Sequence, residues 1–596
     1  MIACFTMTPA NPRNAIRPAS GKLYVRTILA CIVAAVLLLG LWLKRIERLP
    51  IDAGPLRFDE RNAHELMVRL SKDFPNRVTW SDSRRKAALF LKETLRGYGY
   101  APKGMPFSEV IAGEHYTDLE NIYAEKRGAR FPEEIVVVAA HYDVAETTVE
   151  GAMDDASGVG VVLELARVFA KENPDRTLIF LLTDSEEFGA FWGAHQFARH
   201  FDRAGQIIAV INFDFVAPEK QVSILTLSDG LKEGYTPLWL REMALDSIRS
   251  LRSVEAVDFR NVMEHIQRAI LIPAADHGEF LAAGIPAFNW VGQMPDFTRE
   301  MTYYHHTPRD VAEAVRPESM GDFGKASERL IRSLNALAKI PADFRNSSYW
   351  KVTRDSYVEG WVVTLLHLLA FVPFLTLTVT QFRGAFRMHS RKELKRILYG
   401  EVKGVLLLLG AFLMGYMVMI LLPYLRVIQQ FENFPATQKS PFLYSPNFIA
   451  MICVAVAVGL VYWIFKKIFL EGEDYADQPE IRRAIHALLI SIVIAAAMLK
   501  NTYLAVLLLL PPAYLWAGLK ARRRVEGKII NSLLILGGAL TFLIILLVMS
   551  SVFHIGMVYW YLFLATAYGL ISAYSVVLFL VVVAVMARLF RNFVLR

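Results

Sequence analysis

Hydrophobic and polar residues are distributed unevenly along the 596-residue chain. One apolar run covers residues 25–43, a mixed segment follows from about residue 50 to 356, and apolar runs return beyond residue 357. About 20 consecutive apolar residues form a helix long enough to cross a bilayer. The pattern therefore predicts one membrane helix near the N-terminus, a globular middle segment and a C-terminal half built from membrane helices.

The C-terminal half, residues 357–596, reads as an all-α polytopic membrane domain of seven or eight helices. Its final apolar stretch, residues 556–590, is long for one span and short for two, and Gly569 and Ser572 near its middle favour two short helices or one bent helix. The chain total is therefore eight or nine spans. The remaining spans are expected near residues 359–381, 402–424, 447–466, 484–499, 502–519 and 529–550.

Basic residues predict how the chain is oriented in the membrane. Arg383 to Arg396 and Lys520 to Arg524 are basic loops, which stay on the cytoplasmic side. Counting back makes residues 1–24 a cytoplasmic tail and places the globular segment outside, in the periplasm of a bacterium or the lumen of a eukaryotic organelle. A cleaved signal peptide is the competing interpretation of residues 25–43, but Leu41 to Arg45 offers no small-residue cleavage site, so an uncleaved anchor is favoured.

Composition supports this division of the chain. The sequence is 54% hydrophobic and 20% charged, against roughly 45–50% and about 25% in ordinary soluble proteins. Much of the net charge of +8 lies in the basic loops, so we expect no nucleic-acid partner. The lipid bilayer is the expected partner, and the membrane helices could also form a homo-oligomer.

The globular segment, residues 50–350, has the pattern of an α/β fold. Residues 135–140, 177–183 and 207–213 are short β-branched runs without alternation, which is typical of strands buried on both faces. Residues 158–170 have helical spacing between the first two runs. The order predicts a mostly parallel sheet flanked by helices, in which ligands bind beyond the carboxyl ends of the strands.

Polar side chains follow each predicted strand end, and together they suggest a metal site. Each has an ordinary alternative: Asp154 could cap the next helix, and Glu186 with Glu187 could be a solvated pair. Histidine nitrogens and carboxylate oxygens are zinc ligands, and two zinc ions need a bridging carboxylate. Asp143 could hydrogen-bond His141 from behind. The candidate ligands are His141, Asp154, Glu187, Asp214 and His306.

The ordered motifs of the globular segment resemble the dizinc aminopeptidase family, over roughly residues 62–337. That family includes aminopeptidase Y and the glutamate carboxypeptidase II type, and its fold is the zinc-peptidase, phosphorylase/hydrolase-like α/β fold. The layout of anchor, peptidase domain and C-terminal spans is similar to a membrane-bound branch with endoplasmic-reticulum and vacuolar members. The motifs are His141-Tyr-Asp143, Gly151-Ala-Met-Asp154-Asp-Ala-Ser-Gly158, Asp184-Ser-Glu186-Glu187-Phe-Gly189, Asn212-Phe-Asp214, Asp276-His277, Gly284-Ile-Pro286 and His306-Thr-Pro-Arg-Asp310.

The resemblance implies a role for each matching residue and two Zn²⁺ per chain. His141 and Asp214 would hold one zinc, Glu187 and His306 the other, and Asp154 would bridge them. Glu186 would be the general base, with Asp143 and Asp310 supporting the ligands from outside, and a cis peptide would follow Asp154. The implied activity is that of a zinc-dependent exopeptidase acting on peptides, most simply an aminopeptidase.

One position departs from the family pattern. Family members commonly carry Tyr directly before the last ligand, where it stabilises the oxyanion, but here that position is His305, preceded by Tyr303 and Tyr304. His305 could donate the same hydrogen bond, or Tyr304 could reach in. Using His305 as the ligand would restore the Tyr but break the His-Thr-Pro pattern, so His306 is favoured.

Three rival functions remain. A glutaminyl cyclase shares a related fold but uses one zinc, and the full set of five ligands argues against it. A receptor of peptidase descent would be expected to have lost ligands or the base, and here all are present. A transporter would use the C-terminal domain, where His367 lies inside a span and Pro511-Pro512 interrupts another. Interior packing and a kink explain these features more simply.

Overall fold

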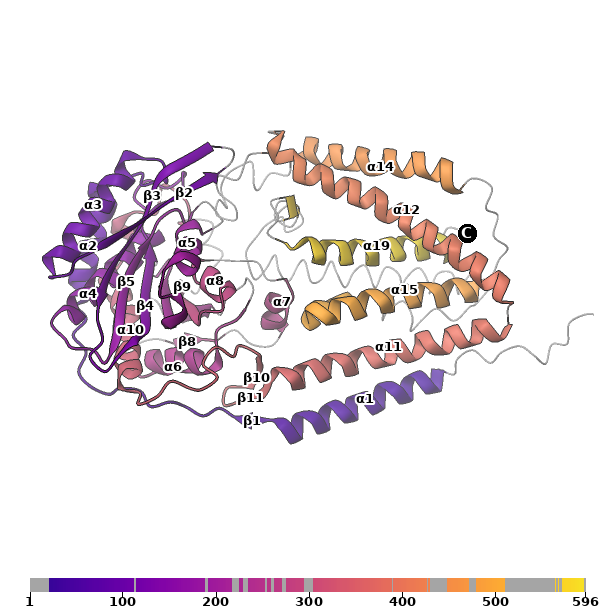
Figure 1. The fold of residues 1–596 in the computed structure, drawn as a ribbon, viewed down its shortest axis with the longest axis horizontal. Coiled ribbons are helices and arrows are strands. Elements are labelled where there is room, and N and C mark those ends of the chain that lie inside the picture. Colours follow the sequence, from indigo (N-terminus) through magenta and orange to yellow (C-terminus); the bar gives the residue numbers. More distant parts are fainter. Residues whose placement is uncertain are drawn as a thin grey trace, which may run out of the picture.

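The computed structural model shows an α/β domain beside a set of long helices (Figure 1). The long helices lie side by side and extend away from the α/β domain. The structure describes residues 21–111, 114–187, 191–216, 224–228, 234–251, 255–258, 262–270, 275–293, 304–388, 390–425, 427–428, 447–470, 479–509, 563, 566–567 and 571–593.

The α/β domain is built on one mixed sheet, which in the described residues has eight strands in the order β2-β3-β5-β4-β6-β9-β7-β8. The centre of the sheet is parallel: β4 pairs with β5 and β6, and β6 pairs with β9. The β2–β3 hairpin and the β3–β5 and β7–β9 pairs are antiparallel. The strands are β2 (Lys103–Ile111), β3 (Glu114–Lys126), β4 (Phe131–His141), β5 (Arg176–Thr183), β6 (Ile207–Phe213), β7 (Ile224–Ser228), β8 (Glu255–Val257) and β9 (Ala287–Gln293).

Both faces of this sheet are covered, which explains the uninterrupted apolar runs. In β4, Val136 and Val138 belong to one hydrophobic core, while Ile135 and Val137 belong to the core on the opposite face. Alternate side chains of a strand point to opposite faces, so a strand covered on both sides needs apolar residues throughout. The first face is covered by α2 (Glu60–Asp73), α3 (Asp82–Gly97), α4 (Ser157–Ala170), α6 (Leu238–Arg249) and α10 (Pro317–Ala336), and the second by α5 (Trp192–His200) and α8 (His277–Ala282). The predicted α/β fold is thus confirmed.

Five described helices are long and apolar enough to cross a membrane, and a sixth apolar helix is shorter. The most central of the five is α15, of which 67% is buried, whereas α1 buries none of its apolar stretch. The expected span at 502–519 is described only as a helix over residues 502–509, and the span at 529–550 and the loop at 520–524 lie outside the described residues. The helices are α1 (Gly21–Trp42), α11 (Gly360–Met388), α12 (Arg391–Tyr424), α14 (Phe448–Leu470), α15 (Pro479–Lys500) and the shorter α19 (Ala573–Phe593).

A small sheet joins the N-terminal helix to the C-terminal helices. Strand β1 (Lys44–Arg45) pairs antiparallel with β11 (Ser356–Glu359), which pairs antiparallel with β10 (Tyr349–Thr353). Strand β1 follows α1 closely and β11 leads directly into α11, so the sheet fixes the ends of these two helices together. The rings of Trp42 and Trp361 meet edge-to-face there, 4.7 Å between centroids. Tryptophan is typical of membrane–water boundaries, which is consistent with a boundary at this level.

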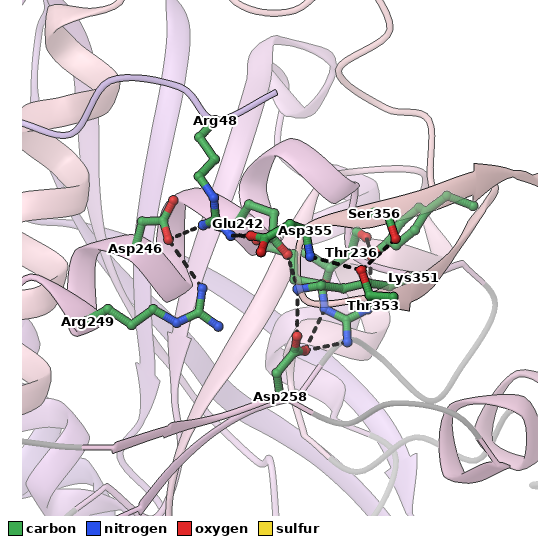
Figure 2. A network of polar contacts seen from close by, with 12 residues as sticks. Arg48, Thr236, Glu242, Asp246, Arg249, Asp258, Lys351, Thr353, Asp355 and Ser356 are labelled. Atoms are coloured by element: carbon green, nitrogen blue, oxygen red, sulfur yellow. Dashed lines mark hydrogen bonds and ion pairs between the residues drawn. The ribbon is translucent and has the colours of Figure 1, made fainter. Parts of the chain in front are cut away.

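A buried set of ion pairs ties this small sheet to the α/β domain (Figure 2). Lys351 on β10 contacts Glu242 of α6, and its Nζ lies 2.6 Å from Asp258 Oδ2. Arg241 Nη2 lies 2.5 Å from Asp258 Oδ1. Arg48, just after β1, contacts Asp246 and has Nη1 3.4 Å from Glu242 Oε2. We call Arg241, Glu242, Asp258 and Lys351 the junction network.

Candidate metal centre

The carboxyl ends of β4, β5 and β6 meet at one edge of the sheet. His141 is the last residue of β4, and it pairs in parallel register with Thr183, the last residue of β5. Asp214 follows β6 directly, and Glu186 and Glu187 lie three and four residues beyond β5. Parallel strands bring their carboxyl ends to the same edge, and His141, Glu186 and Asp214 accordingly lie close together.

Asp154 lies at the centre of the cluster, between two histidines. Its Oδ1 is 3.2 Å from His141 Nε2, and its Oδ2 is 2.8 Å from His306 Nε2. His306 Nε2 is also 3.1 Å from Glu187 Oε2. All of these side chains are buried.

The donor atoms form overlapping groups that could each hold a metal ion. In each group the ligand atoms lie within 4.8 Å of one another. Asp154 belongs to two of the groups and His141 to two, so the clusters share members and adjoin one another. Among the described residues the groups are His141–Glu186–Asp214, His141–Asp154–Glu187 and Asp154–His305–His306.

Two further aspartates hold the backbone that carries these groups. Asp143 Oδ1 accepts a hydrogen bond from the N–H of Glu186 at 3.1 Å, and its Oδ2 accepts from the N–H of Glu187 at 3.2 Å. Asp143 Oδ1 also lies 3.5 Å from His141 Nδ1, which leaves Nε2 facing Asp154. Asp310 accepts from the backbone N–H groups of Met153 and Asp154, at 2.6 and 3.2 Å. Both therefore lie where they can fix the geometry of the cluster.

Arg77 supports the same loops and was not found by sequence reasoning. It is fully buried and its guanidinium donates to five backbone carbonyls, including those of Tyr142 at 2.9 Å, Glu150 at 2.8 Å and Gly151 at 3.1 Å. Burial lowers the pKa of Arg77 to about 10 despite the nearby carboxylates. Every residue has a backbone carbonyl, so the partners of Arg77 carry no side chain that the sequence could reveal.

The capping alternative for Asp154 is resolved by its neighbour. Asp155, not Asp154, accepts a hydrogen bond from the N–H of Gly158, at 3.0 Å, in the first turn of α4. This leaves the Asp154 side chain turned toward the histidines. The peptide bond between Asp154 and Asp155 is cis, as the resemblance implied.

The electrostatics of the cluster reflect a surplus of buried carboxylates. Burial, with Asp214 and Glu187 nearby, raises the pKa of Glu186 well above its ordinary value. The pKa of Asp214 is raised likewise, by burial and Asp154. Burial also raises the pKa of Asp276 to about 7. For His306, burial lowers the pKa but the Glu187 and Asp154 carboxylates outweigh it and raise it to about 10. A bound divalent cation would oppose these shifts, because its charge favours the ionised carboxylates and the neutral imidazole.

The two residues before His306 lie in different surroundings. The side chain of Tyr304 is buried within the hydrophobic core of the α/β domain. The ring of His305 stacks on that of His306, 3.7 Å between centroids, and its side chain is 18% exposed. His305 Nε2 lies 3.5 Å from Asp154 Oδ2. Of the two, His305 is therefore the one that faces the cluster.

Known proteins resemble this chain over part of its length. A probable zinc metalloprotease of Pyricularia oryzae is 33% identical over 143 residues, which are 21% of this chain and 28% of that protein. Aminopeptidase YwaD of Bacillus subtilis is 26% identical over 193 residues, 32% of this chain and 39% of that protein. The solved structure of a zinc aminopeptidase from Bacillus subtilis superposes with a TM-score of 0.41 at 16% identity, over 48% of this chain and 98% of that one.

The chain spans less than half the length of these two curated relatives, so the resemblance is one of domains. Residues 121–331, which contain all five candidate ligands, match the model of Peptidase family M28. This part of the α/β domain is therefore similar to peptidase family M28, in agreement with the dizinc-aminopeptidase motifs.

Proposed function

We propose that this protein is a membrane-anchored, zinc-dependent exopeptidase that removes residues from the free N-terminus of peptides. The observation that carries the proposal is the sharing of Asp154 between two histidines, His141 at 3.2 Å and His306 at 2.8 Å. A carboxylate in that position has one oxygen available to each of two cations. The names of the zinc metalloprotease and aminopeptidase relatives support the same activity.

The residues present fit two zinc ions. Zinc prefers imidazole nitrogen and carboxylate oxygen, and a histidine ligand is commonly held by a carboxylate behind its other nitrogen. Asp143 takes that place behind His141. The Oε1 atom of Glu187 is buried and accepts no hydrogen bond from the described residues, as expected of an atom kept for a cation. His141 with Asp214 would hold one zinc and Glu187 with His306 the other, bridged by Asp154.

When bound, zinc polarises a carbonyl oxygen and lowers the pKa of water. Glu186 is the group we assign to proton transfer: its carboxylate accepts a proton from the attacking water and delivers it to the departing amine. Its backbone is fixed by Asp143, which also fixes the backbone of the adjacent ligand Glu187. One aspartate thus sets the spacing between the base and a ligand.

His305 is the group we assign to the oxyanion. It replaces the usual tyrosine and is partly exposed beside Asp154, whereas Tyr304 is buried in the core. An imidazole N–H pointing at the developing oxyanion supplies the hydrogen bond that the tyrosine hydroxyl would give, and one such donor is worth about 10²–10³ in rate. Hydrolysis by a His305→Phe variant is therefore expected to be slower with zinc binding retained.

The membrane arrangement forms part of the proposal. We assign residues 1–24 to a cytoplasmic tail, 25–43 to the anchor, 50–350 to the peptidase domain on the extracytoplasmic side and 357–596 to the multi-span domain. The five long apolar helices and the basic segment after α11 support this assignment. The lipid bilayer is then a partner along the exposed apolar helix faces, and self-association would use the same faces.

The test compares peptides with free and acetylated N-termini, using the purified full-length protein with and without a chelator. We expect cleavage of the free peptides alone, loss of activity on chelation, recovery of activity with zinc, and two zinc ions per chain.

The Glu186→Gln variant tests the assigned base, and it should slow hydrolysis by about 10²–10⁴ while zinc stays bound. The exposed Glu133→Gln on β4 is the matched control. One zinc per chain with cyclisation of N-terminal glutamine would instead identify a glutaminyl cyclase, and an unchanged Glu186→Gln rate would exclude the assigned base.

A further inference from the structure

Helix α7 (Val262–Ile270) belongs to the peptidase domain in sequence but packs into the membrane helices. Its residue Ala269 is buried in the same hydrophobic cluster as Phe371 and Phe374 of α11 and Leu504 of the helix at 502–509. Figure 1 shows α7 between the α/β domain and the near ends of α11 and α15. We call the long apolar helices after residue 357 the bundle. Helix α7 of the peptidase domain thus packs against the bundle, in addition to the covalent connections between the two parts.

The bundle also hydrogen-bonds the backbone of α7. Asn501 follows α15 directly, and its Nδ2 donates to the carbonyls of Arg268 at 3.0 Å and Ala269 at 3.4 Å. These carbonyls lie in the last turn of α7, and carbonyls in the last turn of a helix generally lack an intrahelical N–H partner. The Nε2 of His265 lies 3.3 Å from the carbonyl oxygen of Tyr503, so it donates there. Asn501 therefore caps α7 from the membrane side.

Aromatic rings complete this contact. The ring of His265 meets those of His367 on α11 and Tyr503 edge-to-face, at 5.3 and 5.0 Å between centroids. His367 Nδ1 lies 2.9 Å from Thr502 Oγ1, which orients the His367 ring. His367, the intramembrane histidine considered above as a sign of transport, thus contacts α7 through His265. This contact gives His367 a packing role.

The opposite side of α7 is fixed to the peptidase domain. Glu264 Oε2 lies 3.3 Å from Arg241 Nη1, which connects α7 to the junction network. Glu264 Oε1 lies 2.9 Å from Arg268 Nη2, and the Arg268 guanidinium stacks 3.6 Å from the ring centre of Tyr235. Helix α7 is therefore held on both sides, by the residues around Asn501 and by the peptidase domain.

The chain leads from α7 to the metal centre in a few residues. Ile270 is five residues from Ala275, a span of at most about 18 Å. Next comes Asp276, which is buried and whose Oδ2 accepts a hydrogen bond from Thr183 Oγ1 at 2.5 Å. Thr183 ends β5, three residues before Glu186. Asp276 thus connects the segment that follows α7 to the strand end that precedes the assigned base.

We infer that the C-terminal bundle positions the metal centre through α7, with Asn501 and His265 as the positioning residues at the contact. The bundle then has a task besides anchoring: it holds α7, and α7 holds the segment that begins at Asp276. This inference rests on the proposed function for its kinetic readout alone. Its structural readout, the protection of backbone amides, does not require that the protein be a peptidase.

The chain supplies a matched pair of asparagines for the test. Asn501 Oδ1 accepts from the N–H of Leu504 at 3.0 Å and so caps the helix at 502–509, while its Nδ2 donates to α7. Asn447 Oδ1 accepts from the N–H of Ala450 at 3.0 Å at the start of α14, while its Nδ2 donates to the Val427 carbonyl at 2.7 Å. Asp at either position keeps the helix cap and removes the donor, but only Asn501→Asp affects α7.

The experiment compares the full-length protein with Asn501→Asp and Asn447→Asp in lipid nanodiscs. We expect Asn501→Asp to lower kcat about fivefold or more, with KM within about twofold of the original value. Hydrogen exchange at 262–270 and 275–282 should become faster in this variant. Asn447→Asp should match the unmodified protein in all of these measurements. Equal kinetics and exchange in the two variants, or faster exchange confined to 262–270, would overturn the inference.

Two variants of His265 provide a second test if the Asn501→Asp protein does not fold. His265→Gln retains an N–H donor for the Tyr503 carbonyl, whereas His265→Leu does not, so the first should keep kcat and the second should lower it. Equal kcat values in these two variants count against the inference. If the unmodified protein hydrolyses no peptide, the proposed function fails, and amide exchange at 275–282 alone decides whether α7 couples the bundle to the centre.

Discussion

Two polar clusters of the molecule, the metal centre and the junction network, both contain buried carboxylates but differ in their balance of charge. In the metal centre, the buried carboxylates of Asp154, Glu186 and Glu187 and the half-buried Asp214 are grouped, among the described residues, with imidazole rings. In the junction network, Glu242 and Asp258 face Arg241 and Lys351 (Figure 2). One cluster therefore has a surplus of negative charge, and the other is neutralised by permanent cations.

This difference appears in the direction of the pKa shifts. Burial and the neighbouring carboxylates raise the pKa of Glu186 and of Asp214. Burial acts on Asp258 in the same sense, but Arg241 and Lys351 outweigh it and its pKa falls below the ordinary value. Burial alone thus does not separate a binding site from a structural network. The sign of the unbalanced charge does, since a surplus of buried carboxylate is stable only with protons or a bound cation.

The largest predicted effect comes from removing the shared carboxylate of the metal centre. Asp154→Asn keeps the shape of the side chain but offers a single neutral oxygen between His141 and His306. The proposed metal pair supplies several kcal/mol of charge stabilisation, so we expect hydrolysis to slow by about 10³ or more and zinc content to fall. Zinc analysis of the purified variant with peptide assays checks both. A full complement of two zinc ions in Asp154→Asn would show that the two clusters do not differ as argued.

The next largest effect is expected in the junction network. Lys351→Met removes a fully buried ammonium and leaves Glu242 and Asp258 with a surplus of negative charge. Breaking a buried ion pair in this way costs about 3 kcal/mol or more of unfolding free energy. We expect a lower unfolding temperature with unchanged zinc content, and no shift for the exposed Lys339→Met. Loss of zinc in Lys351→Met would mean that the two clusters are not independent.

The centre was more predictable from the sequence than the junction, for a physical reason. Apolar runs at 135–140, 177–183 and 207–213 marked the buried strands, and the strand-end rule for α/β sheets then placed His141, Glu187 and Asp214 together. No comparable rule places Lys351 beside Glu242 and Asp258, which lie 109 and 93 residues away along the chain. In the sequence, a buried lysine in a short strand such as β10 cannot be distinguished from a lysine exposed to solvent.

The missed elements share this dependence on distant contacts. Strand β1 has two residues and β11 has four, too few for any periodicity, and each exists because the other is beside it. The β2–β3 hairpin was missed for a related reason, since it lies at the edge of the sheet and lacks the uninterrupted apolar runs of the core strands. The docking of α7 depends on Asn501, more than 230 residues further along the chain. These strands and the docking of α7 depend on contacts between distant parts of the chain, which a local sequence pattern does not reveal.

The smallest effect concerns the pH dependence of the junction. Because the pKa of Asp258 is depressed in the folded protein, its pairing contributes stability above the pKa of the unfolded chain, about 3.9. That contribution is lost as the pH falls through the depressed folded pKa, when the carboxylate takes up a proton. Asp258→Asn should therefore cost about 2 kcal/mol near neutral pH, and this difference from the unmodified protein should shrink below about pH 4. Unfolding temperatures of both proteins between pH 3 and 7, with the exposed Asp343→Asn as control, measure it. A difference that stays constant, or grows, in acid would mean that Asp258 is not held by Arg241 and Lys351, and the contrast with the metal centre would lose its electrostatic basis.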